Sequence, residues 1–300
     1  MGESAAILTS CLWTASSLLF TSAGRKIGAF SVNVYRTTMA IGLLVCAHAV
    51  FLGAVLPVAS GAQWLWMGLS GIVGLGIGDL GLFAAYVSIG PKRTVLMQAS
   101  SPIFASMGAF LAFGETFSLL SLVGVAVTLT GIVVVLLERE KASEEQSAYV
   151  KRKSRGLLFA LISAIGQGFG VALSKKGMYV GVGEAMNPVS AALIRMLLAG
   201  LFIWTCAFFA RKLPELHDAA RDREGIKYAA AGALVGPVVG MTLSMVAIAN
   251  AEAGVAQTLM SLMPVFIIPV TWIIYREKTS WRGILGAVVA VTGVAILFLA

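Results

Sequence analysis

One carboxylate interrupts a long apolar stretch of this chain. Asp79 stands in the segment GIVGLGIGDLGLF, near the middle of the apolar residues 64–87. If that stretch crosses a membrane, a carboxylate there costs about 2.5–3.5 kcal/mol on insertion scales, which makes it a functional candidate. Asp79 could bind an amine or carry a coupling proton. The alternatives are a structural ion pair with Arg36, which lies on the preceding apolar stretch, and a side chain that reaches the membrane surface or water.

Two arginines stand inside apolar stretches at equivalent places, Arg36 in VYRTTMAIGLLV and Arg195 in LIRMLLAG. A guanidinium near the end of such a stretch could hold a carboxylate through two parallel hydrogen bonds. It could equally reach toward the membrane surface and help to set the orientation of the chain.

Further polar and aromatic side chains stand in the same stretches as candidates for a ligand pocket. A small-molecule pocket combines apolar walls with a few convergent polar groups. The best candidates are Gln98 and Gln257, followed by Asn250, with Trp13 and Tyr86 as walls. Ser100, Ser101 and Gln167 stand in these stretches too. The alternative role for every polar group is a hydrogen bond between neighbouring helices.

The sequence lacks the motifs of several other protein classes. It contains no GxSxG, Walker A or HExxH motif, so we expect no catalytic residues, no direct use of ATP and no enzyme activity. His48 and His217 have no cysteine or carboxylate at ligand spacing, so we expect no metal and no cofactor. The net charge of +8 comes from short segments without a basic stripe, which argues against nucleic-acid binding.

The composition indicates that lipid surrounds most of the chain. Hydrophobic residues make up 58 % and charged residues 12 %, against about 25 % charged residues in soluble domains. Long apolar runs without alternation predict spanning helices rather than barrel strands. We expect an all-α integral membrane protein with ten transmembrane helices, over residues 5–24, 32–53, 64–87, 94–112, 118–137, 156–174, 188–210, 228–249, 255–275 and 283–299.

An internal repeat organises these helices. Residues 71–137 align with 233–299 at a constant offset of 162 and without a gap. The matched pairs include Gly74/Gly236, Gly78/Gly240, Ala85/Ala247, Pro102/Pro264, Glu115/Glu277, Gly124/Gly286 and Gly131/Gly293. Such duplication is typical of secondary transporters, whose substrate site lies where the two repeats meet.

Two kinds of repeated residue suggest mechanical roles. The motifs Gly74xxxGly78 and Gly236xxxGly240 allow close helix packing, within the fold or in a dimer, so they leave the oligomeric state open. Missing side chains there could instead leave room for a cavity. Pro102 and Pro264 would free backbone carbonyls within helices and could act as hinges; static kinks are the alternative.

The repeat gives two units of five helices each, residues 1–137 and 156–300, joined by a polar connecting loop at 138–155. Because five is odd, the second unit must cross the membrane upside down relative to the first, as an inverted repeat. The loops on one side hold 18 Lys and Arg residues, and the side with both termini holds only Lys175 and Lys176. The positive-inside rule therefore predicts termini outside the cytoplasm.

The chain resembles the drug/metabolite transporter superfamily, specifically a pair of EamA-type repeats. The resemblance rests on Arg36 and Arg195 in their segments, on SSPIFASMGAFLAFGETFSLLSLVGVAVTLTGI and on MPVFIIPVTWIIYREKTSWRGILGAVVAVTGV. Each half carries a Pro in the fourth span, a Glu at the next turn and a glycine-spaced last span. The resemblance implies a ten-helix basket around a central cavity, export of amino acids or other small metabolites, often coupled to protons, and cytoplasmic termini, which disagrees with the charge count.

The hypothesis from these features is a secondary transporter in the cell membrane that works by alternating access around a midplane cavity. We expect it to export small polar metabolites such as amino acids, by proton coupling or facilitated transport. Its expected partners are a small-molecule substrate, protons and membrane lipids. The first alternative is a carrier of a nucleotide-sugar, a lipid-linked sugar or a cationic drug. The second is a membrane structural or sensory subunit that transports nothing.

Overall fold

The computed structural model describes residues 2–113, 119–136, 146–181, 185–250 and 281–298, together with 259–260, 262–263, 266–267, 270 and 273. All secondary structure in these residues is helical. Before the polar connector the helices are α1 (Gly2–Ile27), α2 (Ala29–Leu52), α3 (Gly61–Ser70), η1 (Gly71–Gly78), α4 (Asp79–Gln98), α5 (Ser101–Phe113) and α6 (Leu119–Leu136). After it come α7 (Gln146–Tyr179), α8 (Pro188–Phe209), α9 (Leu213–Arg221), α10 (Arg223–Ala233), η2 (Leu234–Gly240), α11 (Met241–Asn250) and α14 (Trp281–Phe298).

Six of the described helical stretches are long and apolar enough to cross a membrane. They run over Ser4–Ile27, Ala29–Leu52, Gly61–Gln98, Ser154–Tyr179, Pro188–Phe209 and Arg223–Ala247. The prediction of an all-helical, multi-pass membrane protein is confirmed. The expected ninth span, 255–275, lies mostly outside the described residues, so the count of ten stays a prediction. The expected connecting loop 138–155 is too long, because α7 already begins at Gln146; residues 138–145 lie outside the described residues.

Polar and apolar side chains are distributed as lipid requires. Large apolar side chains such as Leu119 and Phe209 stand on the outside, about four-fifths exposed. Inside, α1 buries a row of hydroxyl groups, most of which bond to the carbonyls of their own helix. The Oγ1 of Thr9 donates to the Ala5 oxygen at 2.8 Å, and that of Thr14 to Ser10 at 2.9 Å. Such bonds satisfy the hydroxyl groups where no water is available.

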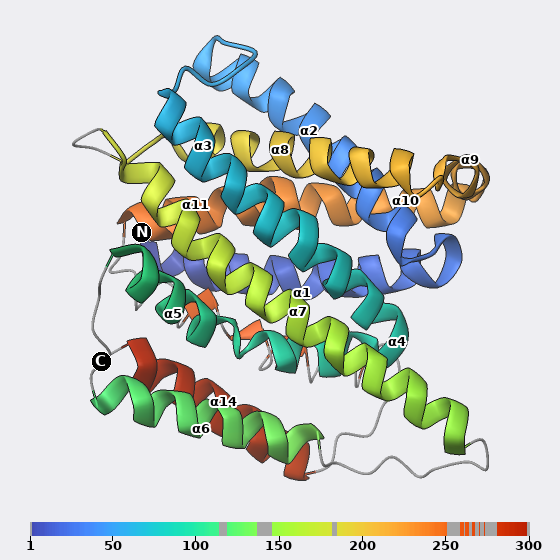
Figure 1. Ribbon diagram of the computed structural model, residues 1–300, viewed down its shortest axis with the longest axis vertical. Helices are drawn as coiled ribbons and strands as arrows, with labels where there is room; N and C mark the ends of the chain where they lie inside the picture. Colours follow the sequence, from blue (N-terminus) through green and yellow to red (C-terminus); the bar gives the residue numbers. More distant parts are fainter. Residues whose placement is uncertain are drawn as a thin grey trace.

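Helices that precede the connector pack on helices that follow it (Figure 1). The long helix α7 packs on α3, η1, α4 and α5, which all precede the connector, and α1 packs on α10, η2 and α11, which all follow it. Helix α2 packs on α8, and α6 on α14. These contacts join the helices that precede the connector to those that follow it, so the interior lies between the two sets.

Matched π-helical segments stand in the third and eighth expected spans. They are η1, with the sequence GIVGLGIG, and η2, with LVGPVVG. Pro237 in η2 has no N–H to donate to the helical ladder, which favours a widened turn there. Both segments are continuous with the α-helices on either side, and both precede a residue that faces the interior, Asp79 or Met241.

Glycines with positive φ angles make the tight connections at one end of the molecule. Gly28, at φ 81°, separates α1 from α2, and Gly90, also at φ 81°, turns the chain within α4 just before Pro91. A side chain at either position would strain the backbone. The Gly90 turn connects the third and fourth expected spans, which accounts for the kink inside α4.

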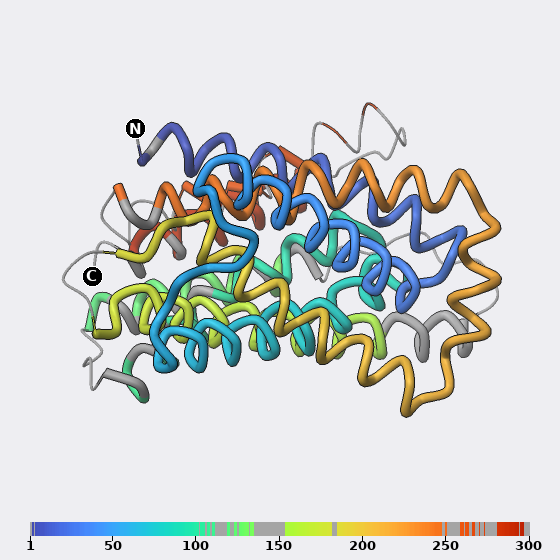
Figure 2. The backbone as a smooth tube through the Cα atoms, turned by 90° about the horizontal axis from the view of Figure 1, so that it is seen from above, coloured from blue at the N-terminus to red at the C-terminus, as the bar shows by residue number. Residues whose placement is uncertain are grey.

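The first residues of α1 and the last of α14 lie at the same end of the molecule (Figure 2). The opposite end carries the Gly28 and Gly90 turns, the start of α7 and the short helix α9, which lies across the others and is seen end-on in Figure 1. Arg25, Lys26, Lys92, Arg93 and the basic residues of α9 therefore gather at the end away from the termini.

Candidate functional site

A cavity of about 180 Å³ lies between the two parts of the chain, and both parts supply its lining. Its charged groups are Arg36, Asp79 and Arg195, and its uncharged polar groups include Gln98 and Gln167. The remaining walls are apolar and aromatic, among them Trp13, Phe20, Phe83, Tyr86, Met241, Met245, Met260 and Met263. This combination matches the general chemistry of small-molecule sites.

Asp79 and Arg36 form a direct ion pair through Oδ2 and a terminal guanidinium nitrogen. Asp79 follows directly on η1, and Arg36 lies two turns inside α2. Both side chains are 4 % exposed. At such burial neither charge is well solvated, so each depends on the other for its stability. The structural ion pair considered from the sequence is therefore present, and it stands in the cavity wall.

Gln167 of α7 is the second partner of the Asp79 carboxylate. Its Nε2 lies 2.6 Å from Oδ1 of Asp79 and 3.3 Å from the Gly74 carbonyl oxygen, which belongs to η1. The sequence placed Gln167 in a lining helix but gave no sign of this contact. Both carboxylate oxygens of Asp79 are consequently occupied by partners within the protein.

Arg36 has further partners that position its guanidinium. Asn33, one turn earlier on α2, accepts from Nε at 3.2 Å and from a terminal nitrogen at 3.0 Å. Sequence reasoning missed Asn33, although its place three residues before an intramembrane arginine was a usable signal. The guanidinium carbon also lies 4.9 Å from the centre of the Phe83 ring and 5.9 Å from that of Phe20, distances at which cation–π attraction applies.

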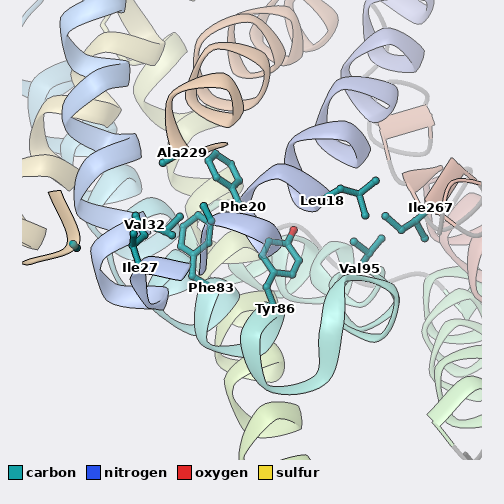
Figure 3. Close-up of a cluster of buried hydrophobic side chains, with 11 residues drawn as sticks. Leu18, Phe20, Ile27, Val32, Phe83, Tyr86, Val95, Ala229 and Ile267 are labelled. Carbon is teal, nitrogen blue, oxygen red and sulfur yellow. The ribbon is translucent and has the colours of Figure 1, made fainter. Parts of the chain in front are cut away.

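An aromatic row beside the ion pair forms part of the cavity wall. Figure 3 shows its three rings, Phe20, Phe83 and Tyr86. Phe20 of α1 and Phe83 of α4 meet edge to face, with ring centres 5.1 Å apart, and Tyr86 follows 6.0 Å from Phe83. Such edge-on contacts add about 0.5–1.5 kcal/mol beyond the burial of apolar area. The row holds α1 against α4 and sets the position of the rings around Arg36.

Arg195 of α8 has a different environment from Arg36. It lines the same cavity and is 4 % exposed. A side chain built on Gly74 would approach its guanidinium at 3.4 Å, and any side chain on Gly71 would overlap its backbone carbonyl, so α8 lies tightly against η1. Its Nε is buried and has no hydrogen-bond partner among the described residues.

The structure brings five of the predicted ligand contacts together: Trp13, Arg36, Asp79, Tyr86 and Gln98 all line the cavity. The Nε2 of Gln98 donates to the Ser163 hydroxyl at 2.6 Å, while its Oε1 is buried without a partner in the described residues. Gln98 thus joins α4 to α7 and lines the cavity.

Two of the sequence-based expectations need correction. Asn250, at the end of α11, is exposed and donates to the Val246 carbonyl at 2.9 Å, so its own helix satisfies it away from the cavity. Pro102 does not interrupt a helix: a turn at Ala99 and Ser100 separates α4 from α5, and Pro102 is the second residue of α5. A proline is tolerated in a first helical turn because no N–H is needed there. Gln257, Pro264, Glu115 and Glu277 lie outside the described residues.

The repeated glycines lie where helices approach each other closely. Gly74 and Gly78 face Gly170 and Gly166 of α7, so that a side chain on Gly170 would meet the Gly74 Cα at 2.9 Å. Side chains on Gly236 and Gly240 would meet Ser16 and Trp13 of α1, at 2.8 and 2.9 Å. Each π-helical segment therefore packs against a helix from the other part of the chain, beside the cavity.

Comparison with known proteins decides the family. A family model of EamA-like transporters matches residues 1–137 and again residues 154–299. The chain belongs to the EamA-like transporter family. The resemblance inferred from the repeated motifs is thereby confirmed, and with it a membrane transporter of the drug/metabolite superfamily that acts on small molecules.

The fold of this chain also occurs in solved structures. One crystal structure, described only as that of a protein, is 18 % identical to this chain, with a TM-score of 0.64 over 99 % of this chain and 96 % of the other. At that identity the likeness concerns the fold alone. A search of curated proteins gives no significant match.

Proposed function

We propose that this EamA-like protein is a secondary transporter that exports small polar metabolites such as amino acids across the cell membrane. The observation that carries the proposal is the cavity between the two parts of the chain, which combines buried charges with apolar walls. In transporters built from repeats, the substrate lies at such an interface, and access alternates as one repeat moves against the other.

The exchange of helix partners supports the proposed inverted repeat of residues 1–137 and 156–300. The first expected span packs on the eighth and the sixth on the third, while the second packs on the seventh and the fifth on the tenth. A two-fold relation between five-helix units, joined by the connector, produces this set of contacts. The substrate would then bind close to the two-fold axis.

The Asp79–Arg36 pair is the proposed charge site of the transport cycle. A proton or a substrate amine that reached Asp79 would compete with Arg36 and Gln167 for its oxygens. Changing the partners of a buried charge alters the relative stability of conformations, which is how a bound group can bias an alternating-access equilibrium. Trp13, Tyr86 and Gln98 would contact the substrate in the same cavity.

The turn at Ala99 and Ser100, followed by Pro102, is the proposed hinge of the first unit. The amide of Ala99 still bonds to Val95 and Leu96, and that of Ser100 to Met97, all near 3 Å. The next helix begins only at Ser101. Because regular helical bonding stops there, α5 can change its angle to α4 with little loss of hydrogen bonds. Pro264 is the corresponding residue of the repeat.

The experiment that tests the proposal combines binding and flux. Thermal unfolding of the detergent-purified protein against a metabolite panel identifies ligands, because a ligand at a hundred times its Kd stabilises the folded state by about 2.7 kcal/mol. The ligands found are then followed in liposomes, with a proton gradient of either sign and without one. Flux that disappears in Asp79→Asn supports the proposal. If no metabolite moves under any of these conditions, the proposal is wrong.

A further inference from the structure

We infer that Arg195 is the receptor for a carboxylate of the transported molecule, so that the substrate is a small carboxylic acid held by its anionic end. The inference deepens the proposed function and rests on it. Among the described residues Arg195 has no carboxylate partner, because Asp79 pairs with Arg36.

Comparison of the two repeats shows that Arg195 lacks, within the described part of the chain, the carboxylate partner that Arg36 has. Arg36 and Arg195 occupy equivalent places in the two halves, and Arg36 pairs with Asp79. At the offset of 162 that aligns the third and eighth expected spans, the residue equivalent to Asp79 is Met241. Met241 follows η2 as Asp79 follows η1, and both line the cavity. The second half therefore has the arginine but carries a thioether where the first half has a carboxylate.

Asp79 cannot serve as a full partner for both arginines. Its Oδ2 is taken by Arg36 and its Oδ1 by Gln167 at 2.6 Å. Among the described residues, the cavity lining thus holds two guanidinium groups and one carboxylate, a surplus of one positive charge. An ion buried without a partner costs several kcal/mol. A carboxylate that enters the cavity removes this cost, whereas a cation adds to it.

The geometry of Arg195 suits such a ligand. The side chain is 4 % exposed, faces the cavity, and has a buried Nε with no partner among the described residues. A carboxylate can accept from Nε and a terminal nitrogen of one guanidinium side by side. Asp79 is the carboxylate that the described lining offers to a substrate amine, and both of its oxygens are already bonded.

The size and walls of the cavity define the rest of the substrate. Its volume of about 180 Å³ is below the roughly 300–1,000 Å³ of sites for drug-sized ligands. Trp13, Met241, Met245 and Met260 supply an apolar lining, and methionine adapts readily to ligands of different shape. We therefore expect a small carboxylate with an apolar body, for which an amino group is dispensable.

Three probes of similar size and three different charges test the inference: benzoate, benzamide and benzylamine. Thermal unfolding of the purified protein should show stabilisation by benzoate and none by the other two. Arg195→Gln should weaken benzoate binding about 30-fold or more, as expected when one partner of a buried charge pair is removed. Arg195→Lys should retain part of the binding, and the surface substitution Arg223→Gln should retain all of it.

A second variant does not depend on the stability of Arg195→Gln. Met241→Asp supplies the carboxylate that the repeat predicts, so it should fold, unfold at a higher temperature than the parent and no longer respond to benzoate. The inference is overturned if benzylamine or benzamide stabilises the protein as well as benzoate does, or if benzoate has no effect. It is equally overturned if Arg195→Gln or Met241→Asp binds benzoate like the parent. Metabolite flux in liposomes, measured separately, decides the proposed function independently of these results.

Discussion

Gln167 donates a hydrogen bond to Asp79 across 2.6 Å and thereby connects α7 to the carboxylate that follows η1. The contact also holds the sixth expected span in register with the third. Hydrogen bonds to charged groups contribute about 1.5–3 kcal/mol. We expect Gln167→Leu to lower the free energy of unfolding by that amount in a denaturant titration. Asn250→Leu, which removes an exposed amide bonded only to its own helix, should change it by less than about 0.5 kcal/mol.

The ion pair of Arg36 and Asp79 should show strong coupling in a double-mutant cycle. Arg36→Met or Asp79→Leu alone leaves a buried charge without its partner and should destabilise the protein by about 3–5 kcal/mol. The double variant removes both charges and should recover most of that loss. Additive losses would show that the two side chains do not depend on each other.

An exposed pair provides the control for this cycle. Lys212 and Glu215 lie 2.5 Å apart and are nearly half exposed, so removing both should cost about 1 kcal/mol or less. A transport measurement on the variants of Arg36 and Asp79 distinguishes a structural role of the pair from a role in transport. The stable double variant of Arg36 and Asp79 should fail to transport; normal flux from it would limit the pair to a structural role.

The close approach of α7 to η1 should make Gly170 intolerant of any side chain. A Cβ at this position would lie 2.9 Å from the Gly74 Cα, and such overpacking costs about 1–3 kcal/mol. Gly42→Ala is the matched control, because Gly42 lies in α2 with nothing within 4 Å of its Cβ position. There the better helix propensity of alanine should stabilise the protein by up to about 1 kcal/mol. Equal melting temperatures for the two variants would contradict the packing described.

The turn before Pro102 should matter for movement rather than for binding. Pro102→Ala allows α4 and α5 to join into one continuous helix, because the restriction on Ser101 is removed. We expect slower flux in liposomes at an unchanged ligand Kd. A static kink would instead leave the flux unaffected, and a loss of binding would place Pro102 in the site itself.

The gathering of basic residues at one end predicts an orientation with the termini outside the cytoplasm. Val58, in the loop after α2 at the end that carries the termini, is 99 % exposed, and Arg221 closes α9 at the other end. In a cysteine-free background, Val58→Cys should react with a membrane-impermeant maleimide in intact cells. Arg221→Cys should react only after lysis. The reverse pattern would agree with the cytoplasmic termini implied by the family.

The sequence predicted the helices and several of the site residues because both depend on local patterns. The register of the repeat and the lengths of the apolar runs predict the bounds of α1, α2, α8 and α14 to within a few residues. Asp79 and Arg36 stand out because charges are rare in lipid.

Contacts between distant parts of the chain could not be predicted in this way. Nothing in the local pattern shows that Gln167 meets Asp79, since the two are 88 residues apart. The same is true of Asn250, whose orientation depends on how α11 packs. The π-helical segment η1 also left no recognisable signal, because its residues are as apolar as those of an ordinary helix. In η2 the one local indication is Pro237, which equally fits a simple kink.

The π-helical segments η1 and η2 set the rotation about the helix axis of the helices that follow them, α4 and α11. An α-helix turns by about 100° and rises 1.5 Å with every residue, and a π-helical stretch accommodates additional residues within the same length of helix. Deleting one residue between 71 and 78 would therefore rotate Asp79 by about a quarter turn, away from Arg36 and Gln167. The same deletion in 234–240 would rotate Met241 away from the cavity. Both halves carry the widening at the same place, so losing it from either copy would misalign the two faces that line the cavity.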